Sequence, residues 1–161
     1  MLCGLLPATS GRLSVAGVNL RTARIEARAN VGYVAQKFSL YSSLSVYENL
    51  RFFGGAYGLT GAHLFRRIEA VMEEFHLREV ADHAAGSLPG GYKQRLSMAA
   101  ALIHEPKILF LDEPTSGIDP LARRTFWREI TALSERGTTI IITTHFMEEA
   151  EYGDRFMLQD H

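Results

Sequence analysis

Apolar residues along the chain alternate between short β-prone runs and longer stretches with helical spacing. Residues 31–35 form a compact β-prone run, residues 107–111 are a short run that is apolar after its opening lysine, and residues 138–144 are β-branched throughout. Runs of this kind are typical of buried strands in a parallel sheet. Because helix-forming stretches stand between them, the pattern predicts an α/β fold with a largely parallel sheet.

Four stretches are predicted to be helical. A helix starts after Ser45, whose side chain is a predicted N-cap, and Glu48 three residues later completes a capping box. Residues 62–77 place apolar side chains at helical spacing with charges between them. Residues 93–104 and 121–135 predict two more helices. The first two stretches indicate a helical insertion between the parts of the sheet.

Both ends of the chain have the character of incomplete elements. Residues 1–6 are apolar with no capping residue before them, as if a helix had been entered partway. Residues 12–20 alternate loosely around Gly17 and predict a short hairpin. Residues 155–158 have the pattern of the start of another strand.

Composition restricts the class of partner. The 161 residues carry 17 Lys and Arg against 18 Asp and Glu, so the balance gives no sign of a nucleic-acid partner. Cys3 is the one cysteine, which excludes an internal disulfide and favours a reducing compartment. No apolar stretch approaches the roughly 20 residues of a membrane-spanning helix, so membrane passage would need another polypeptide.

The strongest chemical signal is a pair of acids after an apolar strand. Asp112 and Glu113 follow residues 108–111, which places them at the carboxyl edge of the sheet, where α/β proteins bind ligands. Asp112 could hold Mg²⁺ through water, and Glu113 could orient and deprotonate a water that attacks a γ-phosphate. A strand followed by an acidic turn is common, however, so the pair alone does not decide the function.

Four motifs together identify a family. Residues 112–120, Asp-Glu-Pro-Thr-Ser-Gly-Ile-Asp-Pro, resemble the Walker B and D-loop of ATP-binding cassette (ABC) ATPases. Residues 88–95, Leu-Pro-Gly-Gly-Tyr-Lys-Gln-Arg, are similar to the signature motif of that family. Gln36 matches the Q-loop, and Thr143-Thr144-His145 looks like the switch histidine. The resemblance implies the P-loop NTPase fold of ABC type, with a helical subdomain.

The resemblance also implies roles for individual residues. Glu113, His145 and Gln36 would be catalytic, with Asp112 and Gln36 at the Mg²⁺ that accompanies ATP. Leu88, Gly90, Gly91 and Asp119 would face the nucleotide and interface of a second ATPase subunit. Glycines before a helix suit this role, because their N–H groups approach an anion closely and the helix N-terminus is partly positive. Without the other motifs, a Gly-Gly turn before a helix would be the simpler interpretation.

These roles divide the chain into three parts. Residues 1–36 would be a remnant of the ATPase core with the Q-loop, residues 45–87 the helical subdomain, and residues 88–161 the part with signature, Walker B, D-loop and switch histidine. The family places such a subunit in the cytoplasm, on the inner face of the membrane, docked to a transmembrane permease. Residues 47–50 and 57–59 resemble drug or ABC-2 type exporters. No sustained heptads separate Q-loop and signature, unlike in chromosome-maintenance relatives.

Three features depart from the family pattern. Pro89 replaces the signature serine and has no N–H, and Tyr92 replaces its glutamine. The sequence contains no Gly-x-x-x-x-Gly-Lys-Ser/Thr loop, the Walker A cradle for phosphates, so the fold is expected to be incomplete at its N-terminus. The alternative function is therefore a non-catalytic or decayed module that binds a partner subunit. Tyr33, Phe52, Phe53 and Trp127 are interpreted as packing residues.

Overall fold

A computed structural model describes residues 14–15, 17–19 and 29–155. Strands β1 (Ser14–Val15) and β2 (Val18–Asn19) pair antiparallel around Gly17, which confirms the predicted hairpin. Gly17 has a φ of +78°, a value that glycine adopts without strain. The helix end expected at residues 1–6, with Cys3, lies outside the described residues, and so do residues 156–158 of the strand expected at residues 155–158.

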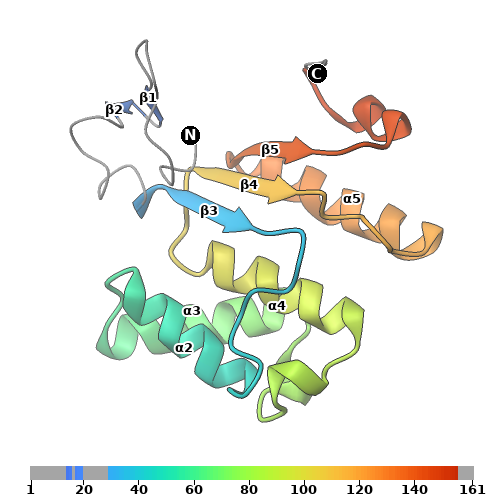
Figure 1. Cartoon of the computed structure of the whole chain (residues 1–161). Helices are drawn as coiled ribbons and strands as arrows, with labels where there is room; N and C mark the ends of the chain where they lie inside the picture. Colours follow the sequence, from blue (N-terminus) through green and yellow to red (C-terminus); the bar gives the residue numbers. More distant parts are fainter. Residues whose placement is uncertain (1–13, 16, 20–28, 156–161) are drawn as a thin grey trace.

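Three parallel strands form the sheet that carries the site. β3 (Val31–Val34) pairs with β4 (Ile108–Asp112), and β4 pairs with β5 (Thr139–Thr143), in the order β3-β4-β5. Figure 1 shows the three arrows pointing the same way, with the helices packed around them. The expected α/β fold is confirmed, and all three apolar runs are strands within one residue of their predicted ends.

The expectation that β5 is a buried strand is wrong. Its residues alternate between exposed and half-buried, and the Ile141 side chain is 37% exposed. β4 is buried at Leu109, Phe110 and Leu111 because strands lie on both of its sides. Within the described residues, β5 has a strand on one side alone. A β-branched composition indicates extended backbone, but burial depends on the neighbours.

Helices α2 (Val46–Ala56) and α3 (Gly61–Glu74) form the predicted insertion. The Ser45 hydroxyl accepts the Glu48 N–H at 3.1 Å, and a Glu48 carboxylate oxygen accepts the Ser45 N–H at 2.8 Å. The predicted capping box is therefore present. Two short 3₁₀ turns, η1 (Arg78–Val80) and η2 (Ala85–Ser87), lead back towards the sheet. Within the described residues, no helix is long and apolar enough to cross a bilayer.

Helix α3 ends three residues before its predicted end. His76 adopts a left-handed φ of +51°, and the next N–H, from Leu77, bonds back to the Met72 carbonyl at 2.8 Å. This geometry is a Schellman motif, which usually takes glycine at the left-handed position. The prediction placed residues 75–77 in the helix because Phe75 and Leu77 continue its apolar pattern, and both are indeed buried.

Helix α4 (Gly90–Leu102) begins three residues earlier than predicted, so Gly90 and Gly91 form its first turn rather than a turn before it. Pro89 is its N-cap residue, and no side chain caps the helix there. Glycine is a poor helix former, which is why the sequence favoured a later start. Packing overrides that preference, because α4 is central and buries nearly every residue from Leu96 to its end.

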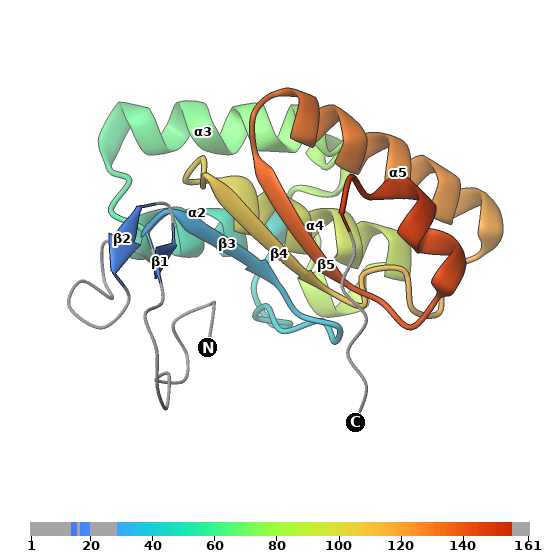
Figure 2. The same cartoon turned by 90° about the horizontal axis from the view of Figure 1, so that it is seen from above.

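The sheet lies directly on the end of α4. A Cβ on Gly32 of β3 would come within 2.5 Å of the Ala101 carbonyl oxygen, so this close approach requires glycine. Figure 2 shows α2 and α4 beneath the strands and α5 (Pro120–Glu135) alongside β5. One hydrophobic core joins these layers, and it includes Trp127, as predicted. The 3₁₀ helix η3 (Met147–Tyr152) follows β5.

Candidate functional site

Predicted site residues from three separate motifs meet where the three strands end. Gln36 follows β3, Glu113 follows β4, and His145 follows β5. The register pairs the last residue of β4, Asp112, with Thr143 at the end of β5. Because the strands are parallel and in this register, the side chains that follow them converge at one edge.

Glu113 is the centre of this group. Its Oε2 accepts a hydrogen bond from Gln36 Nε2 at 2.7 Å, and His145 Nδ1 lies 3.3 Å from the same oxygen. The side chains of Glu113 and His145 are 32% and 55% exposed, so water and a ligand can reach them. A carboxylate held by a neutral amide and an imidazole, open to solvent, can accept a proton from an attacking water.

The backbone at Glu113 is strained. Its φ is +44°, in the left-handed region that a side chain with a Cβ rarely adopts, at a cost of about 1–2 kcal/mol. Hydrogen bonding stabilises this strained conformation, because the Glu113 N–H lies 3.0 Å from the Thr143 carbonyl oxygen and 3.3 Å from Thr143 Oγ1.

Asp112 lies beside Glu113, with both oxygens in hydrogen bonds. Thr143 Oγ1 donates to Oδ1 at 2.6 Å, and the Tyr33 hydroxyl donates to Oδ2 at 3.3 Å. Each oxygen keeps a lone pair, and the side chain is half-buried. This donor set fits a largely hydrated Mg²⁺, which binds few carboxylates and retains waters.

Two residues of this site were missed or misinterpreted from sequence. Tyr33 was interpreted as a packing residue, but it is 41% exposed and bonded to Asp112. The alternation of β3 contained the signal, because Tyr33 stands between buried Gly32 and Val34 and must point to the opposite face. Thr143 was noted only as part of the switch motif. Its partnership with Asp112 depends on the strand register, which the sequence does not display.

The signature residues lie apart from this group, at the start of α4. Gly90 and Gly91 are exposed, and a Cβ on either would meet no atom within 4 Å. The fold of this chain therefore does not need glycine at these positions. Leu88, in contrast, is buried in the core, so it presents no side chain to a ligand. Gln94 Nε2 donates to the Pro114 carbonyl at 2.7 Å and links α4 to the turn after Glu113.

The remaining predicted residue and the signature departures are also at the surface. Asp119 is exposed at the start of α5, where its carbonyl accepts the Arg123 N–H at 2.9 Å. The Tyr92 hydroxyl donates to Glu79 Oε1 at 2.5 Å, and this bond raises the pKa of Tyr92. Tyr92 thus points back to η1 of its own chain, where the Arg95 guanidinium also covers its ring.

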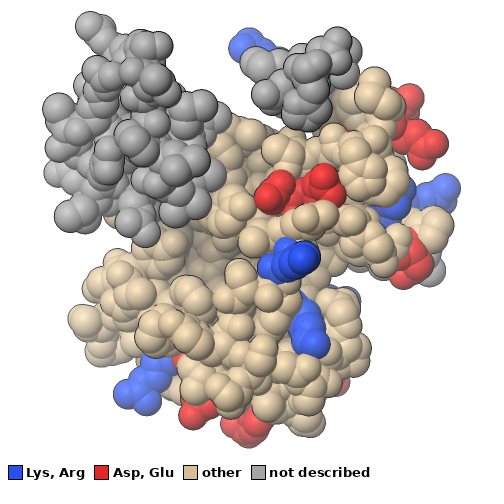
Figure 3. All heavy atoms as spheres, in the orientation of Figure 1, with Lys and Arg blue, Asp and Glu red and all other residues tan. Residues whose placement is uncertain are grey.

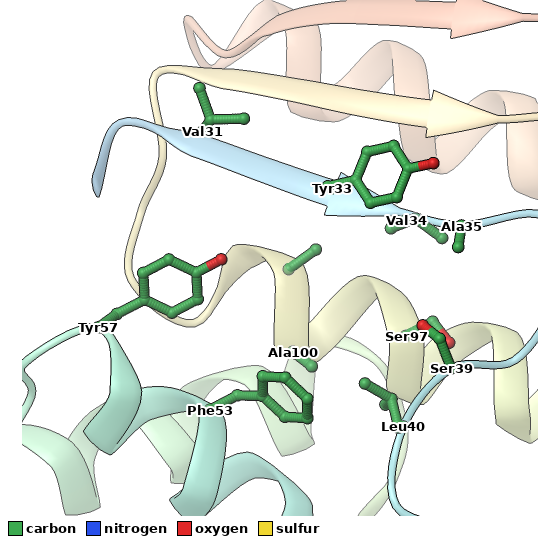
Figure 4. Close-up of a pocket in the computed structure, with 11 residues that line it drawn as sticks. Val31, Tyr33, Val34, Ala35, Ser39, Leu40, Phe53, Tyr57, Ser97 and Ala100 are labelled. Atoms are coloured by element: carbon green, nitrogen blue, oxygen red, sulfur yellow. The ribbon is translucent and has the colours of Figure 1, made fainter. Parts of the chain in front are cut away.

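The surface around the site carries both signs of charge. Figure 3 shows acidic side chains at the strand ends, with basic side chains just below them. A cavity of about 250 Å³ lies below β3, between this strand and the helices α2 and α4 (Figure 4). Tyr33 and Ala35 line it from the sheet side, and Phe53 and Ser97 from the helices.

Phe52 was also interpreted as a packing residue, and this is wrong. Its side chain is 48% exposed on the outer face of α2, where it meets the equally exposed ring of Tyr41 edge to face at 4.8 Å. A groove beside these rings is lined by Leu44, Arg51 and Ala56, among others. Phe53, one residue on, packs against the core as expected.

Comparison with known proteins agrees with the motifs. Residues 1–116 match the family model described as ABC transporter. The chain is 54% identical over 158 residues to the probable multidrug ABC transporter ATP-binding protein YbhF of Escherichia coli strain K12, a match that covers 98% of this chain and 27% of that protein. It is 40% identical over 152 residues to the linearmycin resistance ATP-binding protein LnrL of Bacillus subtilis strain 168, covering 94% and 49%.

Solved structures show the same fold. The chain matches cbiO1 from Clostridium perfringens, described as part of the ABC transporter complex cbiONQ, with 29% identity and a TM-score of 0.79, covering 90% of this chain and 60% of that one. The chain spans from about a quarter to about half of the length of the curated relatives it matches. Its motifs, its fold and these similarities together establish that the chain belongs to the family of ABC transporter ATP-binding proteins.

Proposed function

We propose that this chain supplies the hydrolytic carboxylate of an ATP-driven subunit that energises an exporter. The observation that carries the proposal is the convergence on one Glu113 oxygen of Gln36 at 2.7 Å and His145 at 3.3 Å. In the proposed reaction, Glu113 orients a water and accepts its proton as the water attacks the γ-phosphate of ATP. His145 and Gln36 hold the carboxylate and the water in line.

Asp112 would hold the Mg²⁺ that accompanies ATP. The ion, when bound, supplies positive charge to the phosphate oxygens. The chain's own contribution is orientation, because Thr143 and Tyr33 fix the Asp112 carboxylate in place before any ligand arrives. Such pre-organisation avoids the cost of ordering the group during the reaction.

Gly90, Gly91 and Asp119 would serve a nucleotide sandwiched between two ATPase subunits. Both glycines are exposed at the N-terminus of α4 with open space around them. Each costs helix stability of up to about 1 kcal/mol relative to alanine. That cost has no benefit inside this chain, which supports a role in close approach to a phosphate on a second subunit. Leu88 would contribute through its backbone, since its side chain is buried.

A permease subunit in the membrane would dock on the groove of α2. Exposed Tyr41 and Phe52 offer apolar surface beside it, and exposed aromatic rings are typical of protein interfaces. The relatives named as multidrug or resistance ATP-binding proteins support export as the direction. The subunit would then lie on the cytoplasmic face of the membrane.

The alternative, a non-catalytic module, has its own observation in its favour. Pro89 can donate no N–H at the helix start, and Tyr92 is bonded to Glu79 instead of facing outward. Both features weaken the grip on a partner's phosphate. The two proposals differ in what Glu113 does, which a single substitution can decide.

The test is Mg·ATP hydrolysis by the chain alone and assembled with a complete ATPase subunit of the family and its permease. We expect negligible turnover from the 161-residue chain alone. In the assembly, Glu113→Gln should reduce turnover at least about 100-fold, the low end for a positioned general base. Glu135→Gln, an exposed carboxylate at the end of α5, is the matched control and should change nothing.

One outcome would count against the catalytic proposal, and another would count against the expected need for a second subunit. Turnover that depends on this chain but is unchanged by Glu113→Gln would support the non-catalytic module. Robust hydrolysis by the chain alone, abolished by Glu113→Gln, would show that the chain needs no second subunit.

A further inference from the structure

Glu149 is a buried carboxylate that the proposed reaction does not use. It lies in η3, four residues after His145, and is 3% exposed. Carboxylates are seldom buried to this extent unless they are paired, because leaving water is costly for a charge. Its partners therefore indicate what the residue does.

The two oxygens of Glu149 bind two different parts of the chain. Oε1 accepts a hydrogen bond from Thr115 Oγ1 at 2.6 Å and a longer one from Trp127 Nε1 at 3.4 Å. Arg123 Nε lies 3.7 Å from the same oxygen, which makes an ion pair but is too far for a hydrogen bond. Oε2 accepts a hydrogen bond from Thr144 Oγ1 at 2.6 Å.

These partners stand next to the hydrolytic residues. Thr115 is two residues after Glu113, in the turn that leads to α5, and it is fully buried. Thr144 immediately precedes His145, and its hydroxyl also accepts the Phe146 N–H at 3.0 Å, which closes the turn around His145. Glu149 thus joins, below the surface, the turn after β4 to the turn after β5.

We propose that Glu149 is a positioning residue that sets the distance between Glu113 and His145. The direct contact between those two side chains is open to solvent, and polar contacts of this kind are weak and easily separated. Both hydroxyl bonds to Glu149 are charge-assisted, and the one from Thr115 is buried while the one from Thr144 is partly buried, so they are stronger and better shielded from solvent. The importance of this distance for hydrolysis rests on the function proposed above, whereas the link between the turns does not.

Amide hydrogen exchange in the full chain, measured by NMR without nucleotide, tests the link. Thr115→Val removes one hydroxyl from the Glu149 cluster and keeps the side-chain shape. We expect the amide of Phe146, on the other turn, to exchange at least about tenfold faster, while amides of β4 and α4 keep their rates. Thr115→Ser should restore the wild-type rate. Thr131→Val, which removes a hydroxyl bonded to the Trp127 carbonyl within α5, is the control.

Thr144→Val gives the reciprocal measurement. It also serves if Thr115→Val fails to fold, because Thr144 is an exposed residue and its bond to Glu149 is only partly buried. It should speed exchange at Ser116 and Ile118, whose N–H groups close the turn after Glu113. Unchanged amide exchange rates in the turn that does not carry the substitution, measured in a folded variant, would overturn the proposal. An equal increase in the exchange rates of all amides would also overturn it. The second result would mean that the cluster contributes only to global stability.

Hydrolysis by the assembled subunit adds a separate readout. Thr115→Val should lower kcat about tenfold with an unchanged KM for ATP, and Thr115→Ser should restore it. If exchange responds but Glu113→Gln leaves hydrolysis unaffected, the link stands and the proposed function fails. If Glu113→Gln abolishes hydrolysis while the exchange rates of the far turn stay constant, the function stands and the role of Glu149 fails.

Discussion

Gln36 Nε2 donates a 2.7 Å hydrogen bond to Glu113 Oε2, across 77 positions of sequence. The bond joins the segment that leads into the helical insertion to the residue that would activate water. His145 approaches the same oxygen from the third strand end.

Removal of the Gln36 amide should affect hydrolysis more than folding. Gln36→Ala deletes a hydrogen bond to a charged group, worth about 1.5–3 kcal/mol, so kcat of the assembled subunit should fall at least about tenfold. The free energy of unfolding should change by less than about 0.5 kcal/mol, because the residue is not buried. Steady-state kinetics and urea unfolding measure the two quantities. A loss of stability without a loss of kcat would contradict this role.

Gly91→Ala should reduce hydrolysis while it leaves the stability of the fold unchanged or slightly higher. The new methyl group meets no atom of this chain within 4 Å and removes backbone freedom from a helical residue. The free energy of unfolding should stay constant or rise by up to about 1 kcal/mol. Hydrolysis in the assembly should fall at least about tenfold, because the methyl group occupies the space needed by a phosphate. Gly55→Ala, on the open face of α2, is the control for the effect on stability.

His104 should make folding sensitive to acid. Burial lowers the pKa of His104 to about 4, while its ring stacks on Tyr57 at 3.6 Å and one nitrogen lies 3.1 Å from the Val31 carbonyl oxygen. Since the unfolded chain binds this proton near pH 6.5, the free energy of unfolding should fall as the pH drops from about 6.5 to about 4.

The size of this effect follows from the depressed pKa. Each pKa unit corresponds to about 1.4 kcal/mol, and the half-buried ring reduces the total to about 2 kcal/mol. Urea unfolding at pH 4 and pH 7 should show that His104→Gln loses this part of the pH dependence. His63→Gln, at an exposed histidine of α3, should retain it. If the free energy of unfolding changes with pH equally in the wild type and in His104→Gln, the acid sensitivity does not come from His104.

Asn49 should be a major contributor to the stability of the insertion. It is fully buried, and its amide donates to the carbonyls of Tyr41 and Ser45 at 3.0 and 2.9 Å while its oxygen accepts the Tyr41 N–H at 3.0 Å. Asn49→Ala leaves the Tyr41 N–H without its acceptor and removes the side-chain bonds to both carbonyls, so it should cost at least about 2 kcal/mol in the free energy of unfolding. Asn49→Asp keeps the acceptor for the Tyr41 N–H but buries a charge against two carbonyl oxygens, so urea unfolding should show it at least as destabilised as Asn49→Ala.

The sequence by itself determined the elements and the motif residues. Apolar and β-branched runs identified three strands, and Ser45 and Glu48 identified a helix start. Four motifs in a fixed order, which include Gln36, Glu113 and His145 as well as the signature, identified the family. These features are local or recur in a fixed order, so a linear reading finds them. The same reading could also place the strand ends at one edge, because parallel strands share a direction.

Only the tertiary structure decided which polar groups form the hydrogen bonds that fix the site residues in place. Thr143 reaches Asp112 because the register pairs them, and Glu149 is buried because two turns and α5 close over it. In the sequence, both are ordinary polar residues. Packing likewise moved the start of α4 to Gly90 and left β5 half exposed. The physical reason is that burial and hydrogen-bond pairing depend on neighbours distant in the chain, whereas strand and helix propensity depend on neighbours nearby.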